Sequence, residues 1–271
     1  ESVGSCTDLI ATVVNPLMHF HPSLEIVVSV FADACNLHQR IVQQEVLFDE
    51  EVEYIFMNQL QEADLLVVNK IDLLAAGQIE NLKKHLTQLF PHKTILFQNS
   101  LEKESISVWV SSLQQFQLTQ KRQTLQINYD TYAEGEAKLG WLDEELEILT
   151  PNRTAVAAAT SLIKKIHDAI TSAGYPIGHL KFLLNDGVQK RKLSFVALHQ
   201  SVQNLFPSHS NAGRCILLVN ARVQTDPATL KALVASAIKE VKEQRHCKII
   251  ERKLLAFKPG YPKPQHRMVH S

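Results

Sequence analysis

Cysteine is scarce in this sequence, and its placement excludes several common frameworks. The chain has four cysteines, Cys6, Cys35, Cys215 and Cys247, which are widely separated and form no C-x-x-C pair. This spacing indicates neither a zinc knuckle nor a disulfide framework, and it is typical of a reduced, cytoplasmic protein. The last three lie in or beside apolar strands and are expected in the core, whereas Cys6 leaves a metal or redox role open.

Long apolar runs and an excess charge of either sign are also missing. No apolar stretch approaches the roughly 18 residues that span a bilayer, and the first residues, Glu1 to Gly4, do not form a signal peptide. The 28 basic and 28 acidic residues balance, so electrostatics favour neither nucleic acid nor an anionic membrane as partner. With 45% hydrophobic residues, the 271-residue chain is predicted to be globular, and its length suits two domains.

Short apolar segments alternate with helical periodicity in the first part of the chain. Strands are predicted at 25–31, 65–68 and 94–97, and helices at 49–62, 78–90 and 105–116. Buried strands that alternate with helices are typical of a parallel, doubly wound α/β sheet. The polar stretch between Leu118 and Gly140 is predicted to be a linker.

The pattern changes after residue 140. Strands are predicted at 141–149, 180–184, 193–198, 215–223 and 248–257, with one helix from Thr150-Pro151 to Gly174 and another from Thr225 onward. The order is that of a split βαβ, ferredoxin-like α+β domain with an insertion near 186–212. The Pro-rich tail, 258–271, is expected to lie over the surface.

A polar motif, Asn69-Lys70-Ile71-Asp72, follows the predicted strand at 65–68 directly. Ligands of open α/β sheets bind outside the carboxyl ends of the strands. A carboxylate at Asp72 can accept hydrogen bonds from N1–H and the exocyclic amine of guanine, a pair of donors that adenine lacks. The stem of Lys70 can cover the base while Asn69 braces the loop. The motif predicts guanine binding, and the alternative is a capped turn in which Asp72 starts a helix.

A second motif stands at the first residues. Glu1 and Gly4 have E-x-x-G spacing and precede a Ser/Thr/Asp-containing helix start. A carboxylate at Glu1 can hold a Mg²⁺-bound water, and the Gly4 amide can sense a γ-phosphate, as in order–disorder switches. A capped helix is the alternative interpretation of this common pattern.

Together these motifs resemble the CobW/HypB/UreG family of SIMIBI-class GTPases. The resemblance is carried by Glu1–Leu9 (ESVGSCTDL), Gln59–Asp64 (QLQEAD) and Val68–Leu73 (VNKIDL). The second domain is similar in plan to the C-terminal domain of the CobW branch. The domains implied are a partial P-loop GTPase domain at 1–117, a linker at 118–140, a ferredoxin-like α+β C-terminal domain at 141–257 and the tail at 258–271.

The resemblance assigns roles to individual residues and no metal ligands. It gives switch and catalytic roles to Glu1 and Gly4, and nucleotide-binding roles to Asn69, Lys70, Asp72 and Ser100, the last with Asn99. It implies a GTP-hydrolysing metallochaperone or metallocofactor-insertion protein that uses GTP and Mg²⁺, with Zn²⁺ or another transition metal as cargo. The partner would be a client metalloprotein or cofactor enzyme, and a homodimer stays open.

Two parts of the family pattern do not occur in these residues: the phosphate-binding loop G-x-x-x-x-G-K-[ST] and a C-x-C-C metal motif. Position 1 is Glu, so the natural chain can begin earlier. Without the loop nothing cradles the β- and γ-phosphates, and we expect this chain to bind GTP weakly and to hydrolyse it negligibly. The alternative is a non-catalytic binding or scaffold protein with a degenerate nucleotide fold.

Twelve histidines invite a metal interpretation. His19 and His21 are the closest pair and would point the same way on an extended strand. No third ligand is visible nearby in the sequence, so solvated histidines are the better interpretation. His266 and Arg267 resemble the tail of some CobW-like proteins and indicate surface docking rather than catalysis.

Overall fold

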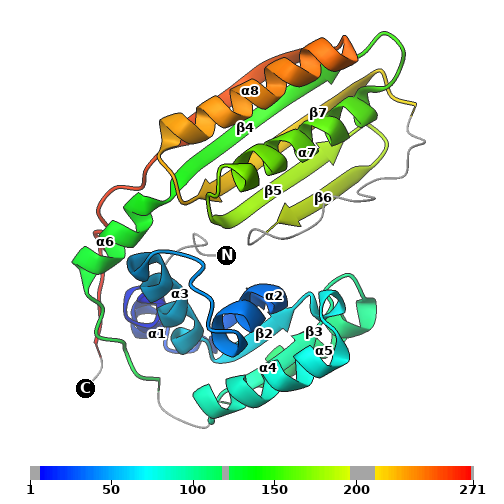
Figure 1. The fold of residues 1–271 in the computed structure, drawn as a ribbon. Coiled ribbons are helices and arrows are strands. Elements are labelled where there is room, and N and C mark those ends of the chain that lie inside the picture. Colours follow the sequence, from blue (N-terminus) through cyan, green and yellow to red (C-terminus); the bar gives the residue numbers. More distant parts are fainter. Residues whose placement is uncertain (1–6, 118–121, 196–210, 270–271) are drawn as a thin grey trace. The chain divides into compact units, whose positions relative to one another are not determined.

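The computed structural model describes residues 7–117, 122–195 and 211–269. The chain divides into two compact units (Figure 1). Unit 1 comprises Glu1–Gly135 and Tyr261–Ser271, and unit 2 comprises Glu136–Gly260. In the sequence, unit 2 is therefore inserted within unit 1, and two chain connections join them. The domain boundaries at 117 and 141 stay a prediction.

Unit 1 contains a three-stranded parallel sheet in the order β1-β2-β3. Its strands are β1 (Ser29–Asp33), β2 (Leu65–Asn69) and β3 (Thr94–Gln98). Residues 65–68 of the central strand are completely buried, which explains why this run is apolar without alternation. The register aligns Asp33, Asn69 and Gln98 in one row at the carboxyl ends of the strands.

The helices of unit 1 supply the other half of its core. The longer ones are α3 (Glu50–Glu62), α4 (Ala76–Leu89), α5 (Lys103–Gln114) and α6 (Tyr129–Lys138). The short segments are η1 (Ile10–Val14), α1 (Asn15–Phe20), α2 (Ala34–Leu37), η2 (His38–Val42) and η3 (Ile71–Leu73). Leu60 of α3 and Leu82 and Leu86 of α4 pack with Leu66 and Val68 of β2.

Two local expectations for unit 1 differ from the structure. The first strand begins at Ser29 and not at Glu25, because residues 25–28 lie outside the β1–β2 ladder. Two of their backbone groups bond to side chains instead: the Val28 amide donates to the Asp64 carboxylate at 2.7 Å, and Arg122 donates to the Ile26 carbonyl. Helix α6 lies in the stretch predicted as a linker.

Helix α6 approaches α3 closely at Gly135. A Cβ added to Gly135 would lie 2.5 Å from the carbonyl oxygen of Glu51 and 2.7 Å from Cδ1 of Ile55. Because a helix carbonyl cannot move aside cheaply, Gly135→Ala is expected to destabilise unit 1 by about 1–3 kcal/mol. Urea unfolding followed by Trp109 fluorescence, in a Trp141→Phe background, measures this change.

Gly77→Ala is the matched control for that measurement. Gly77 lies in the first turn of α4, and an added Cβ there has no atom within 4 Å. The control variant is expected to equal or slightly exceed the parent in stability. Equal urea midpoints for the two variants would contradict the close packing of α6 on α3.

Unit 2 is a five-stranded antiparallel sheet with two long helices on one face (Figure 1). Its elements are β4 (Gly140–Leu149), α7 (Ala155–Ser172), β5 (Ile177–Asn185), β6 (Lys190–Phe195), β7 (Arg214–Val223), α8 (Pro227–Arg245) and β8 (Lys248–Phe257). The strand order is β6-β5-β7-β4-β8. Without the edge strand β6, this is the ferredoxin-like order, so the two sheets confirm the predicted fold class.

The ends of the two helices show which sequence signals determined them. Helix α7 begins at Ala155, so the predicted start at Thr150-Pro151 is wrong. The Thr150 hydroxyl accepts the Thr154 amide at 2.9 Å within a turn, in which Arg153 has φ +60°. The predicted stop is confirmed, since Gly174 has φ +73° directly after α7.

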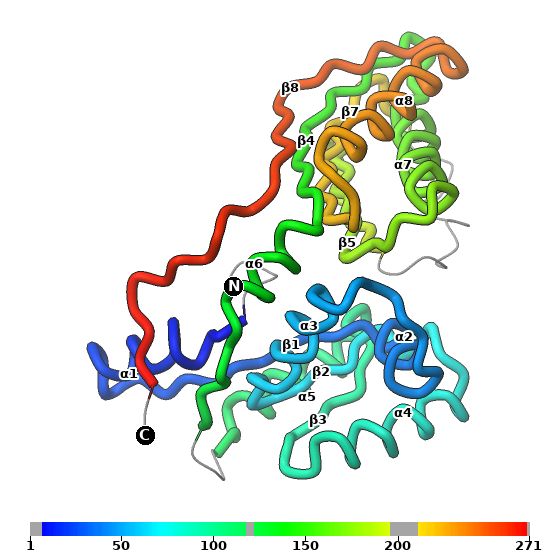
Figure 2. The backbone as a smooth tube through the Cα atoms, turned by 60° about the vertical axis from the view of Figure 1, so that its left-hand side comes forward, coloured from blue at the N-terminus to red at the C-terminus, as the bar shows by residue number. Residues whose placement is uncertain are grey.

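The C-terminal tail returns to unit 1 after Gly260. Figure 2 shows this red segment reaching the region of α1, and the Met268 amide donates to the Ala11 carbonyl at 2.8 Å. Tyr261 and Val269 are about half exposed, so the tail lies on the surface as predicted. Within the described ranges, no helix has the length and apolarity needed to cross a bilayer.

Candidate functional site

The carboxyl ends of the three parallel strands bring together the polar residues predicted to bind a nucleotide. Asp33 ends β1, Asn69 ends β2, and Gln98 ends β3, each aligned with its neighbour. The loops that follow carry Lys70, Asp72 and Ser100. Because adjacent parallel strands end at the same edge, residues more than 60 positions apart in the sequence share one site.

Asn69 ties the loop after β3 to the end of β2. Its Oδ1 accepts the backbone amide of Ser100 at 3.0 Å. Gln98 donates from Nε2 to the Ser100 hydroxyl at 2.8 Å, and Asn99 Oδ1 accepts the amide of Leu101 at 3.1 Å. The Asn69 side chain thus fixes one loop against the other, and its role in nucleotide binding stays a prediction.

Lys70 has a left-handed backbone, with φ 65° and ψ 39°. For a non-glycine residue this conformation costs on the order of 1 kcal/mol, and such residues cluster at functional sites. The ammonium group lies 3.0 Å from Oδ2 of Asp33, whose side chain is 8% exposed. Asp33 also accepts the amide of Asn36 at 3.1 Å and so caps α2.

Asp33 is a site residue that sequence reasoning missed. The predicted strand ended at Phe31, so the residue at the true carboxyl end of β1 received no role. The available signal was an acidic residue directly after an apolar strand that neighbours the Asn69 strand. Its place beside Lys70 shows that three strands, and not two, form the polar edge.

Asp72 lies in η3, a single 3-10 turn, and its side chain is exposed. The next helix, α4, is capped at Ala75, so Asp72 does not have the helix-capping role of the alternative interpretation. The charges of the site also change the pKa of the neighbouring Cys35 thiol. Its pKa is raised to about 11, first by burial and then by the carboxylate of Asp33, with Lys70 opposing and Asp72 adding to the rise. The thiol is therefore protonated at neutral pH and is a poor metal ligand.

The predicted switch residues Glu1 and Gly4, together with Cys6, lie outside the described residues. His19 lies in helix α1 rather than on a strand, with its ring centroid 5.0 Å from that of the exposed Phe20. Within 7–117, 122–195 and 211–269, no group of three or more His, Cys, Asp or Glu side chains could hold a metal ion. Cys215 is buried as predicted, whereas Cys35 and Cys247 are half-buried, and all three are free thiols.

This polar edge fits a purine base better than it fits phosphates. It offers an exposed carboxylate at Asp72, a braced loop at Asn69 and Ser100, and the alkyl stem of Lys70. The cation of Lys70 is already paired with Asp33. The site is therefore suited to a base edge that donates hydrogen bonds, because the Asp72 carboxylate accepts them and the Lys70 ammonium group, which would attract a phosphate, is paired with Asp33.

Comparisons with solved structures give distant similarity only. A hydantoinase/carbamoylase-family amidase from Burkholderia multivorans is 14% identical over 46% of this chain, with a TM-score of 0.30. A putative aminohydrolase from methicillin-resistant Staphylococcus aureus is 12% identical over 47%, with a TM-score of 0.31. The chain spans about a third of the length of these two proteins, 30% and 32%.

A Zn(II)-bound triple mutant of the YjiA GTPase is 10% identical over 84% of this chain and 67% of its own, with a TM-score of 0.24. No curated protein matches the sequence. The family model described as the CobW/HypB/UreG nucleotide-binding domain matches residues 5–97. That range contains β1, β2 and the Asn69-Lys70-Ile71-Asp72 motif. Residues 5–97 are therefore similar to CobW/HypB/UreG nucleotide-binding domains, the family that the sequence motifs resemble.

Proposed function

We propose that this protein is a GTP-binding and GTP-hydrolysing metallochaperone or metallocofactor-insertion protein, and that its described residues recognise the guanine base. The observation that supports the proposal best is the hydrogen bond from the Ser100 amide to Asn69 Oδ1 beside the exposed Asp72. The family match over 5–97 supports nucleotide binding in the same segment.

Base recognition follows from the chemistry of these side chains. The Asp72 carboxylate accepts two hydrogen bonds, one from N1–H and one from the exocyclic amine of guanine. Adenine presents a bare N1 to the same carboxylate, which would place two acceptors against each other. The Lys70 stem covers one face of the ring, while its ammonium group stays on Asp33.

We assign no phosphate contact of the nucleotide to the described residues. These 271 residues contain no G-x-x-x-x-G-K-[ST] loop, and no described cluster could hold a metal ion. We therefore assign base recognition to the described residues and derive no hydrolytic step from them. Glu1 and Gly4 are proposed as switch residues, GTP and Mg²⁺ as ligands, and Zn²⁺ or another transition metal as cargo for a client metalloprotein.

Recognition of the guanine base can be measured by nuclear magnetic resonance with a guanine nucleotide. On titrating the ¹⁵N-labelled chain with GDP, we expect amide shifts at residues 69–73 and 99–101, with a dissociation constant on the order of 1 mM because the phosphates contribute little. ADP at the same concentration should leave these amides unchanged.

Three outcomes would contradict these expectations. Equal shifts with ADP and GDP would contradict guanine recognition, as would shifts confined to unit 2. A micromolar affinity for GTP would contradict the expectation that this chain binds the nucleotide weakly, and it would require a phosphate contact that the motifs do not supply.

A further inference from the structure

The C-terminal tail is fixed to the segment that follows the predicted switch. Asn15 donates from Nδ2 to the Met268 carbonyl at 2.7 Å, and the Met268 amide donates to the Ala11 carbonyl at 2.8 Å. The rings of Phe20 and His266 lie with centroids 5.7 Å apart. Three contacts of different kinds therefore join residues separated by about 250 positions in the sequence.

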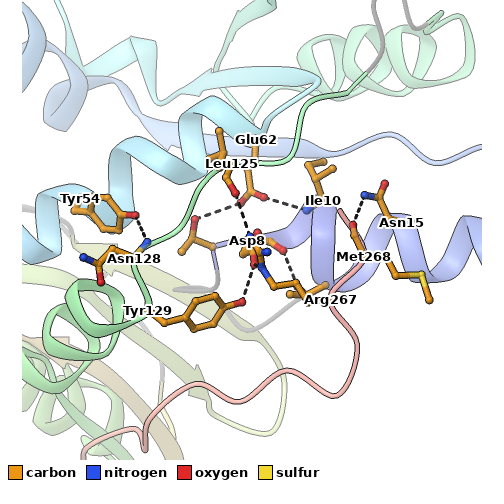
Figure 3. Close-up of polar contacts among 12 residues, drawn as sticks. Asp8, Ile10, Asn15, Tyr54, Glu62, Leu125, Asn128, Tyr129, Arg267 and Met268 are labelled. Atoms are coloured by element: carbon orange, nitrogen blue, oxygen red, sulfur yellow. Dashed lines mark hydrogen bonds and ion pairs between the residues drawn. The ribbon is translucent and has the colours of Figure 1, made fainter. Parts of the chain in front are cut away.

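Arg267, which precedes Met268 in the tail, reaches a completely buried carboxylate, Asp8 (Figure 3). Its Oδ2 accepts the Tyr129 hydroxyl at 2.6 Å and Arg267 Nε at 2.7 Å. Arg267 also donates to the Leu125 carbonyl at 3.2 Å. Because a buried carboxylate is costly unless it is paired and hydrogen-bonded, Asp8 depends on both donors.

The protonation states of the two donors are suited to this role. Burial, followed by the hydrogen bond to Asp8, raises the pKa of Tyr129 to about 12, so the hydroxyl keeps its proton at neutral pH. The hydrogen bond to Asp8 raises the pKa of Arg267 as well. One neutral donor and one cation thus converge on a single oxygen atom.

Both donors belong to the connections that lead to unit 2. Tyr129 is in α6, through which the chain enters unit 2 after Gly135, and Arg267 is in the tail, which re-enters unit 1 at Tyr261. The two connections also contact each other, since the Tyr261 hydroxyl donates to Asp130 at 3.0 Å. The covalent ends of unit 2 are therefore tied together and tied to Asp8.

The segment after the switch is held on its other side by Glu62 from α3. Glu62 accepts the Ile10 amide at 3.0 Å and the Thr7 hydroxyl at 3.3 Å. Burial raises the pKa of this carboxyl group, and the hydrogen bond from the Ile10 amide opposes the rise. Glu62 lies in α3, away from the two connections, whereas Asp8 is bonded to a residue of each connection.

We propose that Asp8, Tyr129 and Arg267 form a coupling cluster through which the state of unit 2 changes the segment 8–15 that follows the predicted switch. A change in the separation of residues 136 and 260 strains both bonds to Asp8 together. By linkage, a change in segment 8–15 acts back on unit 2 to the same extent. The consequence for the nucleotide rests on the proposed function, because Gly4 stands four residues before Asp8.

Amide hydrogen exchange of the full chain, without nucleotide, tests the cluster first. Arg267→Ala is expected to speed exchange about tenfold at the Thr12 and Met268 amides, which donate to the Asp8 and Ala11 carbonyls. Arg267→Lys keeps the charge and should recover part of the protection. Lys263→Ala removes an exposed cation from the same tail and should leave both rates unchanged. Unchanged exchange in Arg267→Ala overturns the proposal.

The coupling itself is tested by perturbing unit 2 alone. Ile163 is fully buried in α7, so Ile163→Ala unfolds unit 2 at a lower urea concentration than the parent requires. At a concentration between the two midpoints, the Thr12 amide should exchange at least about tenfold faster in Ile163→Ala, whereas the Val67 amide in β2 should not change. In the Arg267→Ala background, Ile163→Ala should add nothing.

Three results would overturn the coupling. They are no effect of Ile163→Ala on Thr12, an equal effect with and without Arg267, and a parallel rise at Val67 that shows unit 1 opening as a whole. If Ile163→Ala does not fold, Ile163→Val supplies a milder perturbation of the same core. Since no nucleotide is present, failure here is separate from failure of guanine recognition.

Discussion

An Asp72→Asn variant is expected to lose its guanine preference and to bind xanthine nucleotides instead. Xanthine carries a carbonyl where guanine carries the exocyclic amine, so a side-chain amide can donate to it where a carboxylate cannot. A site that leaves a polar group unpaired typically discriminates by 10²-fold or more. We therefore expect the affinity for GDP, measured from the amide shifts at 69–73, to fall at least about 100-fold. Xanthosine diphosphate (XDP) should instead produce shifts at these amides.

The exposed position of Asp72 makes this substitution a clean test. Its side chain faces solvent in a single 3-10 turn, so the amide can be accommodated without repacking the core. Glu80→Gln, on the exposed face of α4, changes the net charge equally and should keep the GDP preference of the parent. If Asp72→Asn binds GDP and XDP as the parent does, Asp72 does not contact the base.

The base-binding motif could be predicted from the sequence because its determinants are local. Leu65 to Val68 are buried on both faces and therefore apolar throughout, which indicates a central strand, and Asn69 follows without a gap. The role of Asp33 could not be predicted in the same way. Its pairing with Lys70 depends on the register of β1 against β2, and the end of β1 was placed two residues too early.

The cluster at Asp8 was beyond sequence reasoning for a different reason. Arg267 and Asp8 are 259 positions apart, and neither periodicity nor motif spacing reports contacts at that separation. The tail was predicted to lie on the surface, which is correct, but its hydrogen bonds to Ala11 and Asn15 have no sequence signature. The start of α7 failed because Thr150 uses its hydroxyl inside a turn before the helix begins.

Unit 2 carries an acidic residue, Glu144, on the face of β4 that otherwise contributes Leu142 and Leu146 to the core. Burial, followed by repulsion from Glu251, raises the pKa of this carboxyl group to about 7, while Lys231 and Lys242 oppose the rise. In the unfolded chain the carboxyl group has its ordinary pKa of 4.5. Between these two pH values the folded state binds more protons than the unfolded state, so the stability of unit 2 falls as the pH rises.

Replacing Glu144 by Gln should therefore remove most of this pH dependence. At pH 8, Glu144→Gln is expected to be more stable than the parent by about 2 kcal/mol, whereas at pH 4 to 5 the two should be similar. Urea unfolding followed by Trp141 fluorescence in a Trp109→Phe background measures unit 2 selectively. Glu145→Gln, on the opposite face of the same strand, should keep the parental slope. A parental slope in Glu144→Gln would show that the pH dependence originates elsewhere.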